Sequence, residues 1–201
     1  MAPYASKYIP SNAEADGNRE SMLALIETFR SYESKVRANS QSKATRFHER
    51  GQLLPRERIN LLLDPGRPYL ELSSLAGLKM HDDDGADSAM GGGSIAGIGY
   101  VSGVRCLVVA NDSAIKGGSI SPMGLRKTLR AQEIALENKL PVVSLVESGG
   151  ANLEHQSEIF VDGGKIFCNM ARLSAAGIPQ VTVVHGSSTA GGAYLPGLSD
   201  Y

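Results

Sequence analysis

The chain of 201 residues has no tryptophan, only two cysteines and an aromatic content of 5%. Its acidic and basic residues nearly balance, at a formal net charge of -1, so overall charge favours neither nucleic acid nor an anionic membrane as a partner. No apolar run approaches the ~18 residues that a membrane-spanning helix needs. The sequence therefore predicts no nucleic-acid or membrane binding, and any basic site must be local.

The two cysteines, Cys106 and Cys168, form no CxxC pair and have no histidine at ligand spacing. We expect buried, reduced thiols and no metal site. The acidic triplet Asp82 to Asp84 lacks the regular spacing and closing carboxylate of a calcium loop, so we interpret residues 81–93 as a solvated loop. The start of the chain has neither the apolar core of an export signal nor the composition of a transit peptide, which predicts a cytoplasmic protein.

Hydrophobic residues make up 42% of the chain, enough for a sizeable core. The spacing of apolar residues predicts an amphipathic helix over 18–38 and a second helix over 56–63, whose arginines we interpret as structural or intersubunit contacts. The polar, basic residues 39–50 between them either continue as helix, cover a neighbouring subunit or form a solvated face. Later segments alternate between strands and helices, including a hairpin around Ser102 and Gly103, which predicts an α/β fold.

Two stretches share one design, in which a short apolar strand runs into a glycine turn. Residues 140–146 lead into Glu147 and Ser148, and residues 181–185 lead into a turn that opens at Gly186. In adjacent parallel strands both turns would present backbone N–H groups at one place, and an oxyanion needs two such donors. For either stretch alone, a simple tight connection remains the alternative. The predicted catalytic residues are Gly149, Gly150, Ala151, Ala190, Gly191 and Gly192.

Several separated motifs in one order give these turns a context. They are RGQLLPRERINLLLDPG (50–66), VANDSAIKGGS (109–119), LRAQEIALENKLP (129–141), SGGANL, SAAGIP and GSSTAGGAY. From about residue 18 to 201 the chain resembles the carboxyltransferase (beta) subunits of biotin-dependent acyl-CoA carboxylases, and within them the methylcrotonyl-CoA and geranyl-CoA group.

The resemblance implies a ClpP/crotonase-like fold with an N-terminal helical arm. Residues 1–66 would form the arm and helices, and residues 67–201 the first carboxyltransferase domain, incomplete at its end and without the second domain. The family transfers CO2 from carboxybiotin, carried on a partner, to an acyl-CoA. It works as a hexamer with biotin carboxylase and biotin carrier partners. We therefore expect a piece of a longer polypeptide that lacks transferase activity alone.

The site residues fit that chemistry without a hydrolytic triad. Ser148 lies in ESGGA rather than in a GxSxG elbow, and a helix-capping role suits it better than nucleophilic attack. His185 is interpreted as a satisfied histidine at a strand end, with a pocket role as the alternative. In the family's reaction the thioester oxygen is stabilised by N–H donors, and the released biotin nitrogen can take the proton.

The phosphates of coenzyme A require local cations and N–H groups. The family resemblance extends to the KGGS segment, so the predicted CoA-binding residues are Lys116, Gly117, Gly118 and Ser119. Arg126 and Lys127 are secondary candidates. A solvated turn remains the alternative for Lys116.

The segment EIFVDGGKIFCNM departs from the methylcrotonyl pattern, which is longer and contains an aromatic residue. Here Gly163 and Gly164 stand at the expected helix entrance, and a missing ring leaves room for several methylenes. This predicts a substrate pocket for a longer acyl chain, such as geranyl, unless the glycines merely start the helix.

Two other classes of function remain open at this point. One is a different crotonase-superfamily enzyme, a hydratase or thioester hydrolase, with Glu147 as general base. The other is a non-catalytic CoA-binding or assembly fragment.

Overall fold

The computed structural model describes residue 5, residues 12–80 and residues 88–201. The start of the arm, the acidic triplet and the first part of the 81–93 loop lie outside these ranges. Two compact units divide between Lys35 and Val36. Helix α1 (Ala13–Gln41) extends further at both ends than the sequence predicts, and α2 (Ala44–His48) occupies most of the remaining basic segment. A domain boundary at Gly66 stays a prediction. Cys106 is buried but Cys168 is exposed, so the expectation of buried thiols is wrong for Cys168.

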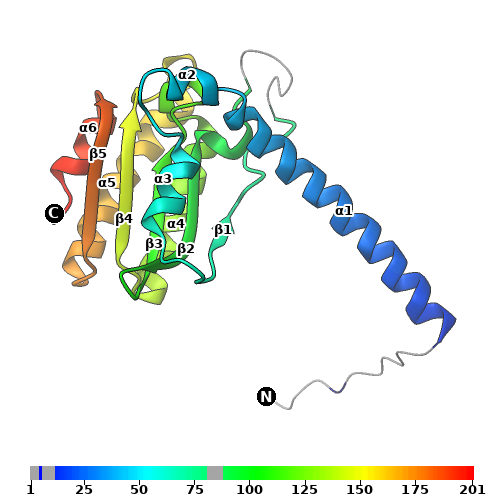
Figure 1. Cartoon of the computed structure of the whole chain (residues 1–201). Coiled ribbons are helices and arrows are strands. Elements are labelled where there is room, and N and C mark those ends of the chain that lie inside the picture. The colour runs from blue at the N-terminus through cyan, green and yellow to red at the C-terminus, as the bar shows by residue number, and fades with distance from the viewer. Residues whose placement is uncertain (1–4, 6–11, 81–87) are drawn as a thin grey trace. The chain divides into compact units, whose positions relative to one another are not determined.

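The second unit contains a five-stranded mixed sheet in the order β1-β2-β3-β4-β5 (Figure 1). Strands β1, β2 and β3 pair antiparallel, whereas β3, β4 and β5 pair parallel. The predicted α/β class is therefore confirmed. The strand bounds are β1 Leu70–Leu72, β2 Ser94–Val101, β3 Val104–Asn111, β4 Val142–Ser148 and β5 Gln180–Ser188.

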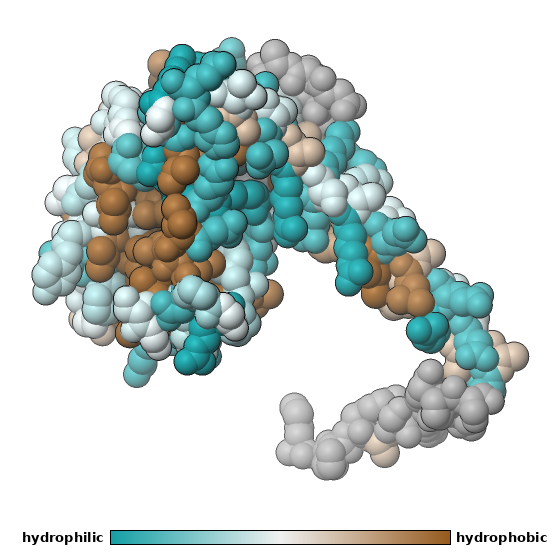
Figure 2. Space-filling view, viewed as in Figure 1, coloured by the Kyte–Doolittle hydropathy of each residue, from teal (hydrophilic) through white to brown (hydrophobic). Residues whose placement is uncertain are grey.

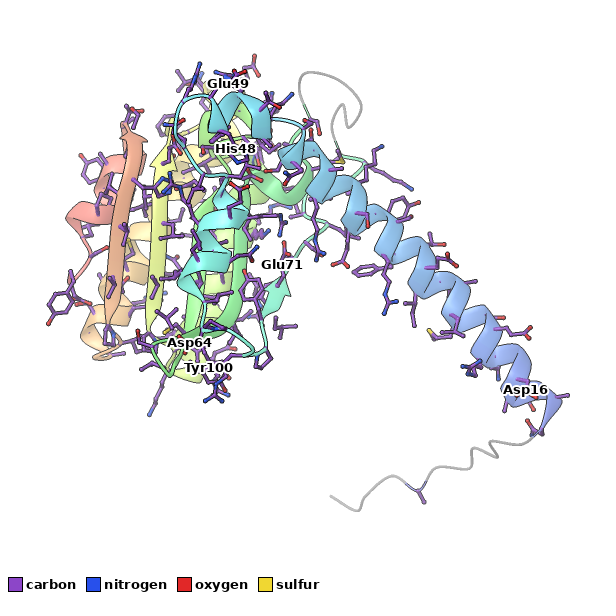
Figure 3. All side chains as sticks on the ribbon, in the orientation of Figure 1. Asp16, His48, Glu49, Asp64, Glu71 and Tyr100 are labelled. Atoms are coloured by element: carbon purple, nitrogen blue, oxygen red, sulfur yellow. The ribbon has the colours of Figure 1, made fainter. Side chains whose placement is uncertain are left out.

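The predicted hairpin between β2 and β3 turns at Ser102 and Gly103, which both have positive φ, at 50° and 80°. A two-residue turn in which both φ angles are positive matches the right-handed twist of the flanking strands. The Asp64 carboxylate accepts hydrogen bonds from both turn N–H groups, at 2.8 and 2.7 Å. Figure 3 shows Asp64 and Tyr100 together at this end of the sheet. Asp64, at the end of the second predicted helix, thus fixes the hairpin.

Helices cover the sheet on both faces (Figure 1). Helix α3 (Pro55–Leu62) packs on one face through Ile59, which joins Ile95, Val108 and Leu145. Helices α4 (Pro122–Asn138) and α5 (Gln156–Ala175) cover the other face, and α6 (Gly191–Gly197) follows β5. Figure 2 shows that the sheet face on which α3 packs also carries an exposed apolar patch beside this helix. No helix in the described ranges has the length and hydropathy to cross a membrane.

An ion pair anchors α3 to strand β1, at the opposite edge of the sheet from β5. Arg56 donates two parallel hydrogen bonds to Glu71, at 2.9 and 2.8 Å, and Figure 3 shows Glu71 on this side of the sheet. Burial opposes the charge of Glu71, but the bonds from Arg56 hold the pKa of this carboxyl below its ordinary value. The bidentate geometry supports a structural role for this arginine of α3.

Because β4 and β5 are parallel, their carboxyl ends lie at the same end of the sheet. Short 3-10 turns lie close to it, at Met90–Gly93 (η1), Lys116–Gly118 (η2) and Leu153–His155 (η3). Helix α2 lies at the same end (Figure 1). In parallel sheets, ligands bind outside the carboxyl ends of the strands.

Lys127, a secondary CoA candidate, is buried inside the protein. Its ammonium donates to the carbonyl oxygens of Gly91 and Ser94, at 3.1 and 2.6 Å. Burial lowers its pKa from 10.5 to about 8, so it remains mostly charged at neutral pH. Lys127 therefore holds the η1 turn, and the prediction of a CoA role for it is wrong.

Replacing Lys127 by Met should destabilise the protein by about 1–3 kcal/mol, because two buried carbonyl groups lose their donor. The matched control is Arg126→Met, which removes an exposed cation from the preceding position and should leave the free energy of unfolding within about 0.5 kcal/mol of wild type. Urea denaturation of the three proteins measures the difference. Equal losses for both variants would contradict the role of Lys127.

Candidate active site

The two glycine turns lie side by side. Ser148 and Ser188 are partners in the β4–β5 register, and the Thr189 N–H donates to the Ser148 carbonyl oxygen at 3.0 Å. A Cβ built on Gly150 would lie 3.2 Å from the Ala190 Cβ and 3.9 Å from the Gly191 nitrogen. Segments about forty residues apart in sequence thus meet at van der Waals distance.

The second turn begins later than the sequence predicts. Strand β5 continues through Gly186 to Ser188, and the chain reverses at Thr189 and Ala190. Gly186 is a strand residue over which the Glu147 side chain lies, because a Cβ there would come within 2.5 Å of the Glu147 carboxyl carbon. The sequence correctly marks position 186 as one that requires glycine, but the reason is close packing of the Glu147 side chain rather than a turn.

The backbone N–H groups of the predicted catalytic residues divide into two sets. Those of Gly149, Gly150 and Gly192 donate to Gly117 O, Ser148 Oγ and Thr189 O, at 3.1, 3.1 and 2.9 Å, so they shape the turns. For Ala151, Ala190 and Gly191, no N–H acceptor exists among the described residues. Donors from both turns are therefore available to a bound molecule.

Ser148 joins these turns to the KGGS segment. Its buried hydroxyl donates to the Gly118 carbonyl oxygen at 3.0 Å and accepts from the Gly150 N–H at 3.1 Å. A Cβ on Gly192 would stand 2.8 Å from the Ser148 Cβ. The hydroxyl is fully engaged and inside the protein, which suits a structural residue.

The predicted CoA-binding segment forms the η2 turn against the first glycine turn. Lys116, Gly117 and Gly118 have positive φ, and a Cβ on Gly118 would lie 2.3 Å from the Glu147 carbonyl oxygen. The next residue, Ile120, pairs with the first turn, because its N–H donates to Gly150 O at 2.8 Å. The segment after Ser119 is thus attached to the predicted catalytic residues.

A polar cavity of about 470 Å³ opens beside this turn. Lys116 and Gly117 line it together with Glu147 and Gly149. Three further cations come from the segment around α2, namely Lys43, Arg46 and Arg50. Sequence reasoning missed these three, although the basic character of residues 39–50 was the signal that could have found them.

An apolar cavity of about 320 Å³ lies on the other side of the turns. Its lining includes Gly163 and Gly164, and also the three residues with available N–H groups, Ala151, Ala190 and Gly191. Gly149 lines both cavities. Residues of the predicted substrate pocket and of the two predicted catalytic turns therefore line the same cavity.

Gly163 and Gly164 are not at the helix entrance. They lie in the interior of α5, which begins at Gln156 after the η3 turn, so the reading that they merely start a helix is wrong. Interior glycines cost about 0.5–1 kcal/mol each relative to alanine. A Cβ on Gly164 would meet no atom within 4 Å, so backbone packing does not explain this cost, whereas an open cavity does.

Glu147, which lines the polar cavity, is half-buried beside a second titratable group, His185. The His185 Nδ1 atom is 3.6 Å from Glu147 Oε2, and neither ring nitrogen has a hydrogen-bond partner within the described ranges. Ser113 donates to the same carboxylate at 2.7 Å. Burial and the charge of Arg58 lower the pKa of His185, against the opposing effect of Glu147. The interpretation of His185 as a satisfied histidine is wrong.

Because its pKa is lower in the folded state, His185 should make the protein less stable as the pH falls below about 6.5. In that range the unfolded histidine binds a proton that the buried ring accepts less readily. His185→Gln should therefore show a smaller loss of unfolding free energy than wild type between about pH 7.5 and about pH 5.5. Urea denaturation at both pH values tests this, and parallel changes in the two proteins would contradict it.

Comparisons with known proteins show which family the chain resembles. The model of the carboxyl transferase domain family matches residues 46–201. A probable mitochondrial methylcrotonoyl-CoA carboxylase beta chain of Drosophila melanogaster is 51% identical, covering 94% of this chain and 33% of the relative. A probable biotin-dependent acyl-coenzyme A carboxylase beta2 subunit of Mycobacterium tuberculosis is 49% identical, covering 100% of this chain and 36% of the relative.

Among solved structures, the beta subunit of P. aeruginosa geranyl-CoA carboxylase superposes with a TM-score of 0.89 at 62% sequence identity. The superposition covers 98% of this chain and 37% of that subunit. The chain thus spans about a third of the length of each of these proteins.

Proposed function

The chain belongs to the carboxyl transferase domain family, and we propose that it is part of a carboxyltransferase subunit of a biotin-dependent acyl-CoA carboxylase. The subunit transfers CO2 to a branched or unsaturated acyl-CoA of the geranyl-CoA or methylcrotonyl-CoA type. One observation carries this proposal. Gly149 lines both a cationic and an apolar cavity, and residues of the two turns with unpaired N–H groups line the apolar one.

This arrangement fits an acyl-CoA along its length. The phosphates suit Lys43, Arg46, Arg50 and Lys116, which make a local positive site in a chain of nearly zero net charge. The acyl chain suits the apolar cavity over Gly163 and Gly164. The thioester lies between them, at Gly149.

The chemistry assigned to this chain is stabilisation of negative charge. In the family's reaction the substrate's proton can go to the biotin nitrogen that has released CO2. The thioester oxygen would then become a dienolate oxygen, which would accept hydrogen bonds from the N–H groups of Ala151 in the first turn and of Ala190 or Gly191 in the second. Fixed donors in a site that excludes water stabilise such an oxygen without reorganisation. Gly149, Gly150 and Gly192 hold the turns in place for this purpose.

Biotin, carried by a partner, would supply the carboxyl group. Unpaired N–H donors on residues that line the apolar cavity suit an oxygen acceptor such as a thioester or ureido carbonyl, so the residues present fit both groups. We propose a homo-oligomer, a hexamer in keeping with the family resemblance, with biotin carboxylase and biotin carrier partners. The cytoplasmic location stays a prediction, since the Drosophila relative is mitochondrial by name.

A hydratase with Glu147 as general base gains no support from the geometry. The Glu147 carboxylate is held by Ser113 and lines the cationic cavity, whereas the available N–H groups line the apolar one. The distinguishing assay is dependence on biotin and bicarbonate. A hydratase turns over enoyl-CoA without either, and an assembly fragment binds no acyl-CoA at all.

Gly192→Val in the full-length subunit, assayed with its biotin-carrying partner, should lower kcat by about 10²-fold or more. The added side chain meets the Ser148 Cβ at 2.8 Å and displaces the second turn from the first. The matched control is Gly197→Val at the far end of α6, where a Cβ meets no atom within 4 Å. Unchanged turnover in the Gly192 variant would contradict the role of the turns.

Gly164→Phe should move the preference of the holoenzyme from geranyl-CoA towards methylcrotonyl-CoA, because the ring fills the apolar cavity. The measurement is kcat/KM for geranyl-CoA, methylcrotonyl-CoA and a saturated medium-chain acyl-CoA. Lys165→Phe, an exposed position of the same helix outside the cavity lining, is the control. A wild-type preference for the short substrate, or no change with Phe at 164, would refute the geranyl assignment while leaving the transferase proposal standing.

A further inference from the structure

The face of α5 towards the apolar cavity carries an interrupted aromatic stripe. Residues three or four positions apart share one face of a helix, so Phe160, the glycines at 163 and 164, and Phe167 follow one another along it. All four line the cavity. The cavity therefore lies over the glycines, with a phenylalanine ring on either side.

The two rings are held differently. Phe160 is 60% exposed, whereas Phe167 is half-buried and packs against the cluster of Leu125, Ile166 and Met170. The Phe167 ring also contacts the Tyr194 ring of α6, with centroids 5.5 Å apart and planes at 52°. Tilted aromatic contacts of this kind are favourable beyond simple burial. Phe167 is thus a fixed wall, and Phe160 borders the open end.

Tyr194 also connects this wall to the second turn. It lies three residues after Gly191, within the short helix that the turn begins. Helix α6 therefore links the N–H groups of that turn to the side chain that contacts the Phe167 ring. A chain held by its thioester at the turn would meet the Phe167 ring after a fixed number of carbon atoms.

We infer that Phe167, held in place by Tyr194, is the end wall that limits the length of the acyl chain in this site. The inference rests on the proposed function, because it requires the apolar cavity to hold an acyl chain. Gly164 sets the width of the cavity and Phe167 its depth. Phe167 is a specificity-determining residue, and Tyr194 positions it.

Phe167→Ala should extend the cavity, so that affinity continues to rise by about 3- to 4-fold per methylene beyond the wild-type limit. Phe167→Leu should extend the limit by less and keeps a large apolar side chain, in case the alanine variant folds poorly. Tyr194→Ala should broaden the length limit by freeing the ring, whereas Tyr194→Phe retains the contact and the limit. Phe160→Ala should alter affinity similarly at all lengths without moving the limit.

The experiment is isothermal titration of the full-length subunit and each variant with saturated acyl-CoAs of increasing chain length and with CoA alone. The limiting length should increase in the Phe167 variants and in Tyr194→Ala only, and kcat/KM of the holoenzyme should follow the same order. Binding by wild type with an unchanged limit in both Phe167 variants, or an increase in Phe160→Ala, would overturn this inference alone. The inference is also wrong if wild type binds acyl-CoAs of every length no more tightly than it binds CoA alone. If wild type binds no acyl-CoA at all, the proposed function is wrong as well.

Discussion

The buried hydroxyl of Ser148 is the contact on which the site depends. It donates to Gly118 of the η2 turn, accepts from Gly150 of the first glycine turn, and leaves room beside it only for Gly192 of the second. Three segments far apart in the sequence are thus fixed by one side chain. Removing the hydroxyl would leave a buried donor and a buried acceptor unpaired, which is costlier than losing an exposed contact.

The sheet makes this contact possible. Strands β3, β4 and β5 are parallel neighbours, so their carboxyl ends reach the same edge in chain order. Helices α4 and α5 return the chain across one face, and α5 brings its glycines under the turns. The buried ammonium of Lys127 supports the same edge from the η1 side by satisfying two carbonyl groups. The positions of the donors follow from the sheet, and their availability follows from the turns.

The elements with a local cause could be predicted from the sequence. The hairpin at Ser102 and Gly103, the parallel order of β4 and β5, and the pairing of the two turns all follow from apolar runs and turn chemistry. The family resemblance is confirmed by the carboxyl transferase model and by the geranyl-CoA carboxylase structure, which also confirms the crotonase-like fold.

The elements with a distant cause could not. The sequence predicts Gly186 as a turn residue, yet glycine is needed there because the Glu147 side chain of the neighbouring strand lies over it. The glycines of α5 read as a helix start, yet η3 moves that start to Gln156. The α2 cations read as a solvated face because nothing local shows that they line a cavity with Lys116. In each case the partner lies far away in the sequence, where composition and periodicity carry no signal.

The glycines of the site differ in the reason that glycine is found at each position, and Gly149 is the exception among them. Gly118, Gly150 and Gly192 are required by positive φ or by a neighbour too close for a Cβ. Gly149 has neither constraint, because its backbone is ordinary and a Cβ would meet only the Gly117 oxygen, at a normal 3.6 Å. A side chain there would add atoms to the lining of both the cationic and the apolar cavity. Neither a backbone angle nor a close neighbour requires glycine at 149, so the space of the two cavities is the constraint that remains.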